Sequence, residues 1–188
     1  MELDQGLFDL LNAHRSVRPR PQYGVPGNLD VASIEAQLGF PLPPDFVYLF
    51  QNVQDPDGLL FPWVTFEKEQ YDRSIAWVLK GIEFDVKSNA FWLERWGDKP
   101  KVLDDGFAIV REDFKTWPKL LPIFGHRFLA AEPCLAGNPV FSIMQTDIIY
   151  YGADLAHYLL QEFVDPNYLE HTYAQPIRKI EVWSDLAS

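Results

Sequence analysis

The sequence predicts an α+β fold in which a mostly antiparallel sheet packs against several helices. Apolar residues recur at helical spacing in separate segments, and short β-rich segments divided by turn residues follow one another between residues 122 and 151. No internal repeat or linker divides the chain. We therefore expect a single domain over residues 1–188, in which residues 1–28 form an N-terminal helix and a Pro-rich extension.

The composition is that of a chain that folds around a packed core. Its 188 residues are 47% hydrophobic and 15% aromatic, which excludes global disorder and supplies a core without disulfides. Cys134 is the single cysteine, so a reducing compartment is favoured. The N-terminus lacks the basic region of a secretory signal, and no apolar run reaches membrane-spanning length. These features predict a soluble cytoplasmic protein that does not bind membranes.

The chain is strongly acidic, with a formal net charge of −11. Nucleic acid is disfavoured as a partner, because phosphate binding requires a basic surface. A basic protein is the more natural partner, although acidity also serves solubility alone, and both interpretations stay open. A positive cluster at Arg15, Arg18 and Arg20 lies in a Pro-rich segment and is interpreted as a solvated loop.

The N-terminal segment predicts a short helix followed by an irregular connection. Phe8, Leu10 and Leu11 suggest this helix, and we expect it to end near Ser16. Prolines and a glycine between residues 19 and 27 then prevent any regular element.

The segment from Ile34 to Phe50 predicts two short helices separated by a stop. Asn28 or Asp30 is expected to cap the first helix, and Gly39 ends it. Pro44 suits the first position of the second helix, because its fixed φ is helical and its missing N–H has no partner there anyway. The apolar stripe of the second helix consists of Phe46, Leu49 and Phe50.

Turn, strand and helix signals follow one another after this module. Residues 51–58 contain turn-forming residues, and residues 59–66 predict one or two strands broken at Pro62. Glu67 begins an amphipathic helical pattern. The apolar positions of that helix are Tyr71, Ile75, Val78, Leu79 and Ile82.

The next segment carries a cluster of aromatic residues. Trp92 and Trp96 lie four residues apart and form one apolar ridge, which suits core packing or a ligand platform, and Gly97 ends the short helix that carries them. Residues 101–111 predict a loop that leads into a short strand, with a turn at Asp104-Asp105-Gly106.

The C-terminal third predicts an antiparallel meander and a closing helix. Its β-rich segments are residues 122–128, 139–144 and 148–151, separated by turn residues. Helical spacing returns from Asp154 and is ended by Pro166. Residues 177–183 alternate in polarity and predict a last strand.

Catalytic, cofactor and metal motifs are absent from the sequence. It contains no Gly-rich phosphate-binding loop, no nucleophile elbow and no zinc-type spacing of Cys and His. His126, predicted mid-strand beside Arg127, is the best candidate for a catalytic base, but no partner residue is evident. His157 is expected to be solvated, and Cys134 is either a nucleophile or a small buried residue.

Paired carboxylates occur at turns and helix starts. Capping and the helix dipole explain such positions without a metal, although a cation site made from Asp55 and Asp57 stays open. We therefore predict a protein that is not an enzyme and that uses no cofactor and no metal.

Three stretches together resemble the SUKH superfamily of Smi/Knr-type proteins. The first stretch is similar to the helix, Leu-Pro restart and second helix of that family. The second stretch is similar to its Trp-Gly-x-x-Pro segment, and the third to its C-terminal meander and closing helix. The resemblance covers most of residues 30–185. The first stretch carries the match at Ile34, Leu38, Leu42, Pro43, Phe46 and Leu49. The second carries it at Trp96, Gly97 and Pro100, and the third spans Leu121 to Phe163.

The resemblance implies an α+β binding protein rather than an enzyme. Bacterial members are commonly immunity proteins that neutralise a cognate toxin, often a nuclease, by direct binding, and fungal members regulate cell-wall synthesis. Because an acidic chain suits a basic toxin domain, we predict an immunity protein, with a housekeeping scaffold or regulatory protein as the alternative. A third hypothesis is an enzyme built around His126 and Arg127. The predicted partner contacts are Asp55, Asp57, Trp63, Trp92, Glu94 and Trp96.

Overall fold

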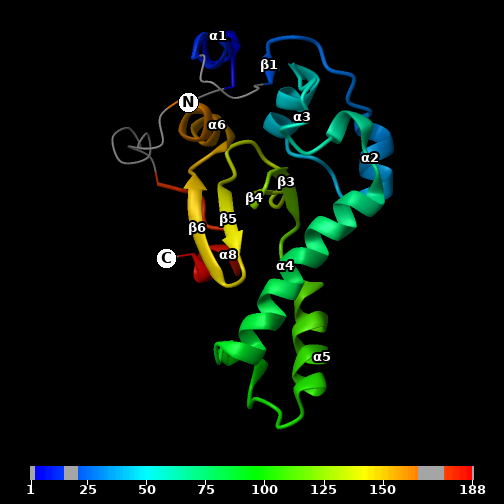
Figure 1. Cartoon of the computed structure of the whole chain (residues 1–188), viewed down its shortest axis with the longest axis vertical. Helices are drawn as coiled ribbons and strands as arrows, with labels where there is room; N and C mark the ends of the chain where they lie inside the picture. Colours follow the sequence, from blue (N-terminus) through cyan, green and yellow to red (C-terminus); the bar gives the residue numbers. More distant parts are fainter. Residues whose placement is uncertain (1–2, 15–20, 165–175, 188) are drawn as a thin grey trace.

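Helices lie on both sides of an antiparallel sheet in the computed structural model, which describes residues 3–14, 21–164 and 176–187 (Figure 1). The α-helices are α1 (Gln5–Ala13), α2 (Val31–Leu38), α3 (Pro44–Gln51), α4 (Lys68–Ser88), α5 (Leu103–Phe114), α6 (Leu155–Phe163) and α8 (Trp183–Leu186). The 3₁₀ helices are η1 (Trp63–Thr65) and η2 (Glu94–Trp96). The strands are β1 (Gln22–Tyr23), β2 (Val53–Gln54), β3 (Leu120–Phe124), β4 (Arg127–Ala130), β5 (Val140–Met144) and β6 (Asp147–Gly152). The α+β class predicted from the sequence is confirmed.

The main sheet is the predicted meander. Its strands lie in the order β3-β4-β5-β6, and each pairs antiparallel with the next. One boundary was wrong, because residues 122–128 do not form a single strand: β3 ends at Phe124, and a turn at Gly125-His126 leads into β4. β1 and β2 form a separate two-stranded ribbon, so the prediction that no regular element forms between residues 19 and 27 is wrong at Gln22 and Tyr23.

The sheet is covered on both faces, so it separates two apolar clusters. Successive residues of β4 and the residue after it alternate between them: Phe128 and Ala130 belong to one cluster, and Leu129 and Ala131 to the other. This follows from the two-residue period of a strand, which sends neighbouring side chains to opposite faces. The cluster that contains Leu129 also receives α1, α3 and α6, and the cluster that contains Phe128 receives α4, α5 and α8.

The helix-stop-helix module forms as the local sequence predicts. Asp30 caps α2 by accepting a hydrogen bond from the Ser33 amide at 3.1 Å. Gly39 ends α2 with φ of 80°, a conformation that glycine adopts without strain. Pro44 is the first residue of α3, and the predicted stripe of Phe46, Leu49 and Phe50 is buried.

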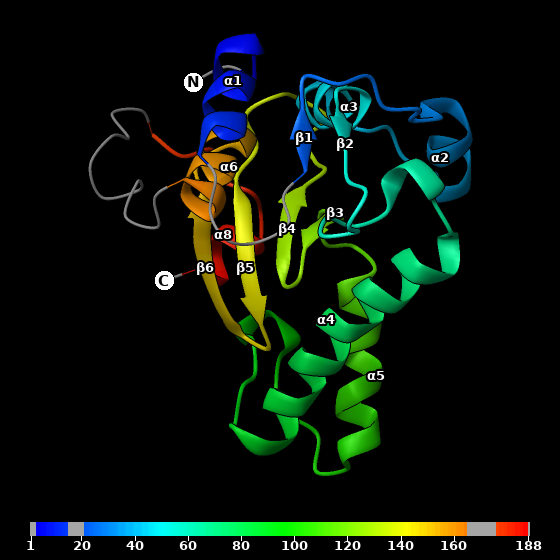
Figure 2. The same ribbon diagram turned by 45° about the horizontal axis from the view of Figure 1, so that its top comes forward.

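α4 and α5 lie side by side and project away from α1, α2 and α3 (Figures 1 and 2). α4 forms as predicted, but the expected loop and strand at residues 101–111 are wrong, because most of this segment belongs to α5. Asp104 and Asp105, interpreted as turn residues, lie in the first turn of α5. Their negative charges interact favourably there with the positive end of the helix dipole.

One buried carboxylate joins the helical hairpin to the sheet. Asp85 of α4 is 3% exposed and accepts hydrogen bonds from the Thr146 amide at 2.8 Å and the Thr146 hydroxyl at 2.6 Å. Thr146 lies in the turn between β5 and β6. Gly81 lies against this turn so closely that an added Cβ would sit 2.9 Å from the Cα of Gln145.

Two further predicted strands are wrong. Residues 59–66 contain η1 in place of a strand, and a backbone hydrogen bond of 2.7 Å from the Phe61 amide to the Ile123 carbonyl joins this segment to the edge of β3. Residues 177–183 lead into α8, which presents Trp183 to the core, and an isolated bridge pairs Ala187 with Ile148 at the edge of β6. In both segments, apolar residues whose pattern suggests a strand are buried in the core although the backbone that carries them is not a strand.

α6 confirms the closing helix but corrects one of its residues. Asp154 caps it by accepting a hydrogen bond from the His157 amide at 2.7 Å. His157 is 3% exposed and not solvated, because most of α6 is buried. The predicted stop at Pro166, the arginine cluster at residues 15–20 and Ser16, near which the first helix was expected to end, lie outside the described residues. No helix in the described part of the chain is long and apolar enough to span a membrane.

Candidate functional site

The segment from Pro21 to Glu67 has an unusual charge distribution. It contains six carboxylates, at positions 30, 35, 45, 55, 57 and 67, and no Lys, Arg or His. In the structure it forms β1, α2, α3, β2 and η1. We call residues 21–67 the acidic segment, and it carries more than half of the net charge of −11.

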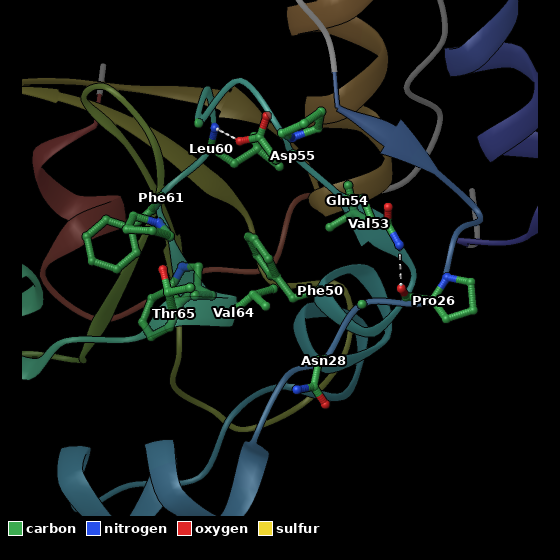
Figure 3. A pocket seen from close by; sticks show the side chains of 15 residues that line it. Pro26, Asn28, Phe50, Val53, Gln54, Asp55, Leu60, Phe61, Val64 and Thr65 are labelled. Carbon is green, nitrogen blue, oxygen red and sulfur yellow. Dashed lines mark hydrogen bonds between the residues drawn. The ribbon is translucent and has the colours of Figure 1, made fainter.

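A pocket of about 420 Å³ opens within the acidic segment (Figure 3). Its buried wall is apolar and comes from α3, β2 and η1, and its rim is formed by prolines and by Val64, which is 43% exposed. The buried wall residues are Phe50, Val53, Leu60 and Trp63. Among the described residues, Asp55 is the single charged side chain of the lining, and no cation contributes to it.

A turn held by Asp55 forms one side of the pocket. The Asp55 carboxylate accepts a hydrogen bond from the Leu60 amide at 2.6 Å (Figure 3). The Gly58 amide donates to the Asp55 carbonyl at 3.2 Å. Gly58 has φ of 64°, which closes this turn. Asp55 therefore fixes the shape of the loop, whereas Asp57, at its tip, is exposed.

A second oxygen of Asp55 lies buried without a hydrogen bond. The described residues supply no partner for Oδ1. They also contain no group of three or more His, Cys, Asp or Glu side chains arranged to hold a metal ion. Asp55 and Asp57 thus gain no third ligand from the described part of the chain.

Trp63 is part of the core and not of the surface. It is 1% exposed, and its indole N–H donates to the Pro122 carbonyl at 2.8 Å. Its ring stacks on Phe66 at 5.3 Å and meets the edge of Phe46 at 4.9 Å. The interpretation of Trp63 as an exposed partner contact is therefore corrected: it forms the back of the pocket, and only neighbouring side chains reach the surface.

The other predicted contacts lie at the tip of the α4–α5 hairpin. Trp92 is half-buried and Glu94 is exposed, whereas Trp96 is buried. The two indoles meet edge to face with ring centroids 5.0 Å apart, and the Trp92 N–H donates to the Gly97 carbonyl at 2.7 Å. The predicted ridge exists, and it is turned largely inward.

Asp113 of α5 holds this aromatic cluster together. One of its oxygens accepts hydrogen bonds from the indoles of Trp96 and Trp117, each at 2.8 Å, and from Arg95 at 2.5 Å. Burial opposes ionisation of this carboxyl, but the hydrogen bonds from Trp117, Trp96 and Arg95 outweigh it and lower the pKa of Asp113. The carboxylate therefore has a structural role in joining η2 to α5.

The structure separates the six predicted contacts into two groups. Asp55, Asp57 and Trp63 lie at or near the pocket, before the N-terminus of α4, and Trp92, Glu94 and Trp96 follow its C-terminus. A helix of 21 residues, the length of α4, spans about 30 Å. These residues therefore do not form one continuous binding surface.

His126 and Arg127 are neighbours in the chain, but the described contacts of Arg127 are with other residues. His126 lies in the turn between β3 and β4, and not mid-strand as predicted. Partial burial and, to a lesser degree, neighbouring Arg127 lower the pKa of its imidazole. Arg127 donates to Ser142 at 2.9 Å, pairs with Glu162 at 3.3 Å and lies over the ring of Tyr151 at 3.6 Å. Arg127 thereby joins the sheet to α6.

Cys134 is partly buried against the acidic segment. Its thiol donates to the carbonyl of Leu42 at 3.4 Å, and burial raises its pKa, with a smaller effect from the nearby carboxylates. A raised pKa reduces the thiolate fraction and with it the nucleophilicity of the sulfur.

The pocket was not predicted from the sequence. Its lining joins residues 26–28 to residues 50–65, and the long connection between them gives no local sign that they meet. The absence of cations from residues 21–67 was the one available signal.

Comparison of this chain with protein-family models, with curated proteins and with solved structures finds no match. The resemblance to the SUKH superfamily therefore stays a prediction, and function has to be inferred from the pocket and from the charge around it.

Proposed function

We propose that this protein is a non-enzymatic binding protein that captures a basic protein partner in the cytoplasm. In this proposal it acts as an immunity protein of the SUKH type, and the partner is a toxin domain. The observation that carries the proposal is an apolar pocket set in a 47-residue segment, residues 21–67, that contains six carboxylates and no cation.

The pocket is suited to an apolar anchor residue. Its volume of about 420 Å³ falls within the range typical of binding pockets. Its aromatic and aliphatic walls lose unfavourable contact with water when a partner side chain fills it, and full burial of one large apolar side chain contributes about 1.5–3 kcal/mol. Protein interfaces commonly concentrate their binding energy in such anchors.

The surrounding carboxylates select the kind of partner. Asp30, Asp57 and Glu67 are exposed in the acidic segment. Their field attracts a basic surface, accelerates its association and disfavours acidic or phosphate-rich competitors. Rapid capture is what an immunity protein requires, because its toxin acts as soon as it is free.

The test is calorimetric titration of the purified protein with the toxin domain encoded beside its gene. A Val64→Asp variant introduces a carboxylate at the pocket rim, and a matched Val102→Asp variant makes the same change before α5, where the side chain is 57% exposed. We expect a complex whose affinity falls about tenfold in the Val64 variant and is unchanged in the Val102 variant.

Two results would count against the proposal. Absence of a complex at micromolar concentration, or of any toxin gene nearby, would favour the housekeeping scaffold. An equal loss of affinity in both variants would show that added charge, and not the pocket, determines binding.

A further inference from the structure

α4 carries a row of exposed cations and aromatic residues on the side that faces away from the core. Trp77 is 44% exposed and Phe84 is 49% exposed, although both are large and apolar. With 100° of rotation per residue, all five residues of the row fall within about 80° of the helix circumference, opposite buried Val78 and Ile82. We call this row the outer face of α4, and it consists of Arg73, Trp77, Lys80, Phe84 and Lys87.

The three cations of the outer face have no ion pair or hydrogen bond within the described residues. Other cations of the hairpin are engaged: Lys68 pairs with Asp72, and Arg111 pairs with Glu83. Glu69 begins the same row, is exposed and forms no ion pair with Arg73. The outer face is therefore a local positive surface on a chain with a net charge of −11.

The outer face has a seven-residue period. Its cations lie at positions 73, 80 and 87, and its aromatic residues lie at positions 77 and 84. A helical partner with a seven-residue repeat keeps the same spacing, because both helices rise about 1.5 Å per residue. Such a partner can bring a carboxylate to each cation and an apolar side chain to each ring.

One end of the outer face opens onto a groove. Arg73 and Trp77 line a hollow of about 550 Å³ together with Pro62 and His126. A partner helix laid along α4 therefore has space for side chains on the side of the β3–β4 turn.

We propose that the outer face of α4 is a second docking surface, and that it binds an acidic amphipathic helix of a partner protein. The aromatic residues provide the apolar contact, and the unpaired cations select carboxylates. This surface differs in charge and in preferred partner from the pocket in the acidic segment, so the two proposals are tested separately.

A second copy of the chain fits this surface less well. An antiparallel pair of α4 helices would place the three cations of one copy against those of the other, which is unfavourable. A membrane or a nucleic acid also fits less well, because its extended array of phosphates would be repelled by the carboxylates of the whole acidic protein. A single helix meets only the hairpin, and repulsion from more distant carboxylates is screened beyond about 8–10 Å at physiological salt.

The test is fluorescence anisotropy with a labelled synthetic helix that repeats Glu and Leu at seven-residue spacing, and with a matched helix that carries Lys in place of Glu. We expect the full-length protein to bind the Glu peptide in a salt-sensitive manner and to bind the Lys peptide much more weakly. Lys80→Glu should weaken binding of the Glu peptide about tenfold, and Phe84→Ser should also weaken it. Lys101→Glu makes an equal charge change at an exposed residue outside the outer face. It should change the affinity for the Glu peptide by no more than about twofold.

The proposal is overturned if the Glu peptide fails to bind at near-millimolar concentration, or if Lys80→Glu and Lys101→Glu have equal effects. It is also overturned if the protein does not bind the Glu peptide but binds single-stranded DNA or phosphatidylserine vesicles, and Lys80→Glu abolishes that binding. Self-association that is abolished by Phe84→Ser, measured by sedimentation, would assign the outer face to a second copy of the chain instead. Val64→Asp is expected to leave binding of the Glu peptide unchanged, since Val64 does not line the groove beside Arg73.

Discussion

The acidic segment and the α4–α5 hairpin have opposite organisations of charge. Residues 21–67 contain six carboxylates and no cation, whereas residues 68–119 contain ten carboxylates and ten cations. Residues 68–119, which comprise the hairpin and the connection that follows it, are thus neutral in sum. Ion pairs form between residues of this region, and three cations are left without one on the outer face of α4. The comparison shows that a chain with a net charge of −11 can contain both a segment without cations and a helix face on which cations gather.

The aromatic residues of the two regions also differ in burial. Replacing one tryptophan of each region with alanine should therefore produce the largest expected effect on the free energy of unfolding. Trp63→Ala removes a side chain that is 1% exposed and should lower the free energy of unfolding by about 3–5 kcal/mol. Trp92→Ala removes a half-buried ring and one hydrogen bond, and should lower it by about 1–2 kcal/mol. Urea denaturation monitored by circular dichroism measures both. Equal losses would contradict the assignment of Trp63 to the core and of Trp92 to a half-buried position.

A carboxylate on the hairpin should stabilise the fold in a pH-dependent manner. Asp113→Asn weakens the acceptor shared by three donors and should lower the free energy of unfolding at neutral pH by about 1–3 kcal/mol. Because the folded pKa of Asp113 is lowered from 3.8, its contribution is complete above that value and is lost as the pH falls through the folded pKa.

The difference in stability between wild type and Asp113→Asn should therefore shrink only below about pH 4, which urea titrations at stepped pH will show. Asp57→Asn serves as the control, since Asp57 is exposed in the acidic segment and its exchange should change stability by less than about 0.5 kcal/mol. A difference that stayed constant down to low pH would show that the carboxylate is not ionised in the folded protein.

The smallest effect is expected at the boundary of the two regions, where His126 lines the groove together with Pro62 and Arg73. Burial and Arg127 lower the pKa of His126, so the unfolded chain binds its proton more readily and stability should decline as the pH falls below 6.5. His126→Gln should remove this decline, which is small because solvent screens the partly exposed imidazole. Thermal melts at pH 7.5 and 5.5 measure it, and an unchanged decline in the variant would assign it to another group.

Short-range signals in the sequence predicted most of the fold. The Gly39 stop and the Pro44 start act within one or two turns of backbone, so they determine α2 and α3 whatever packs against them. The meander was predicted for the same reason, because turn residues and strand period are local.

Errors arose where tertiary packing decides the outcome. Asp104-Asp105-Gly106 has the composition of a turn, yet the stripe of Val110 and its apolar neighbours against α4 makes it the start of α5. His157 has a polar side chain on a helix that happens to be covered on nearly every side. Neither burial nor the pocket follows from spacing alone, because both depend on which distant segments meet.

The two strands at the ends of the meander, β3 and β6, are the places where another molecule would most easily add a strand. The Phe61 amide is bonded to the β3 carbonyl at Ile123, and Ala187 pairs with Ile148 on β6. Strand edges blocked in this way are poor templates for aggregation. Removal of the last few residues, even without loss of the core, should therefore make the protein more prone to aggregate through β6.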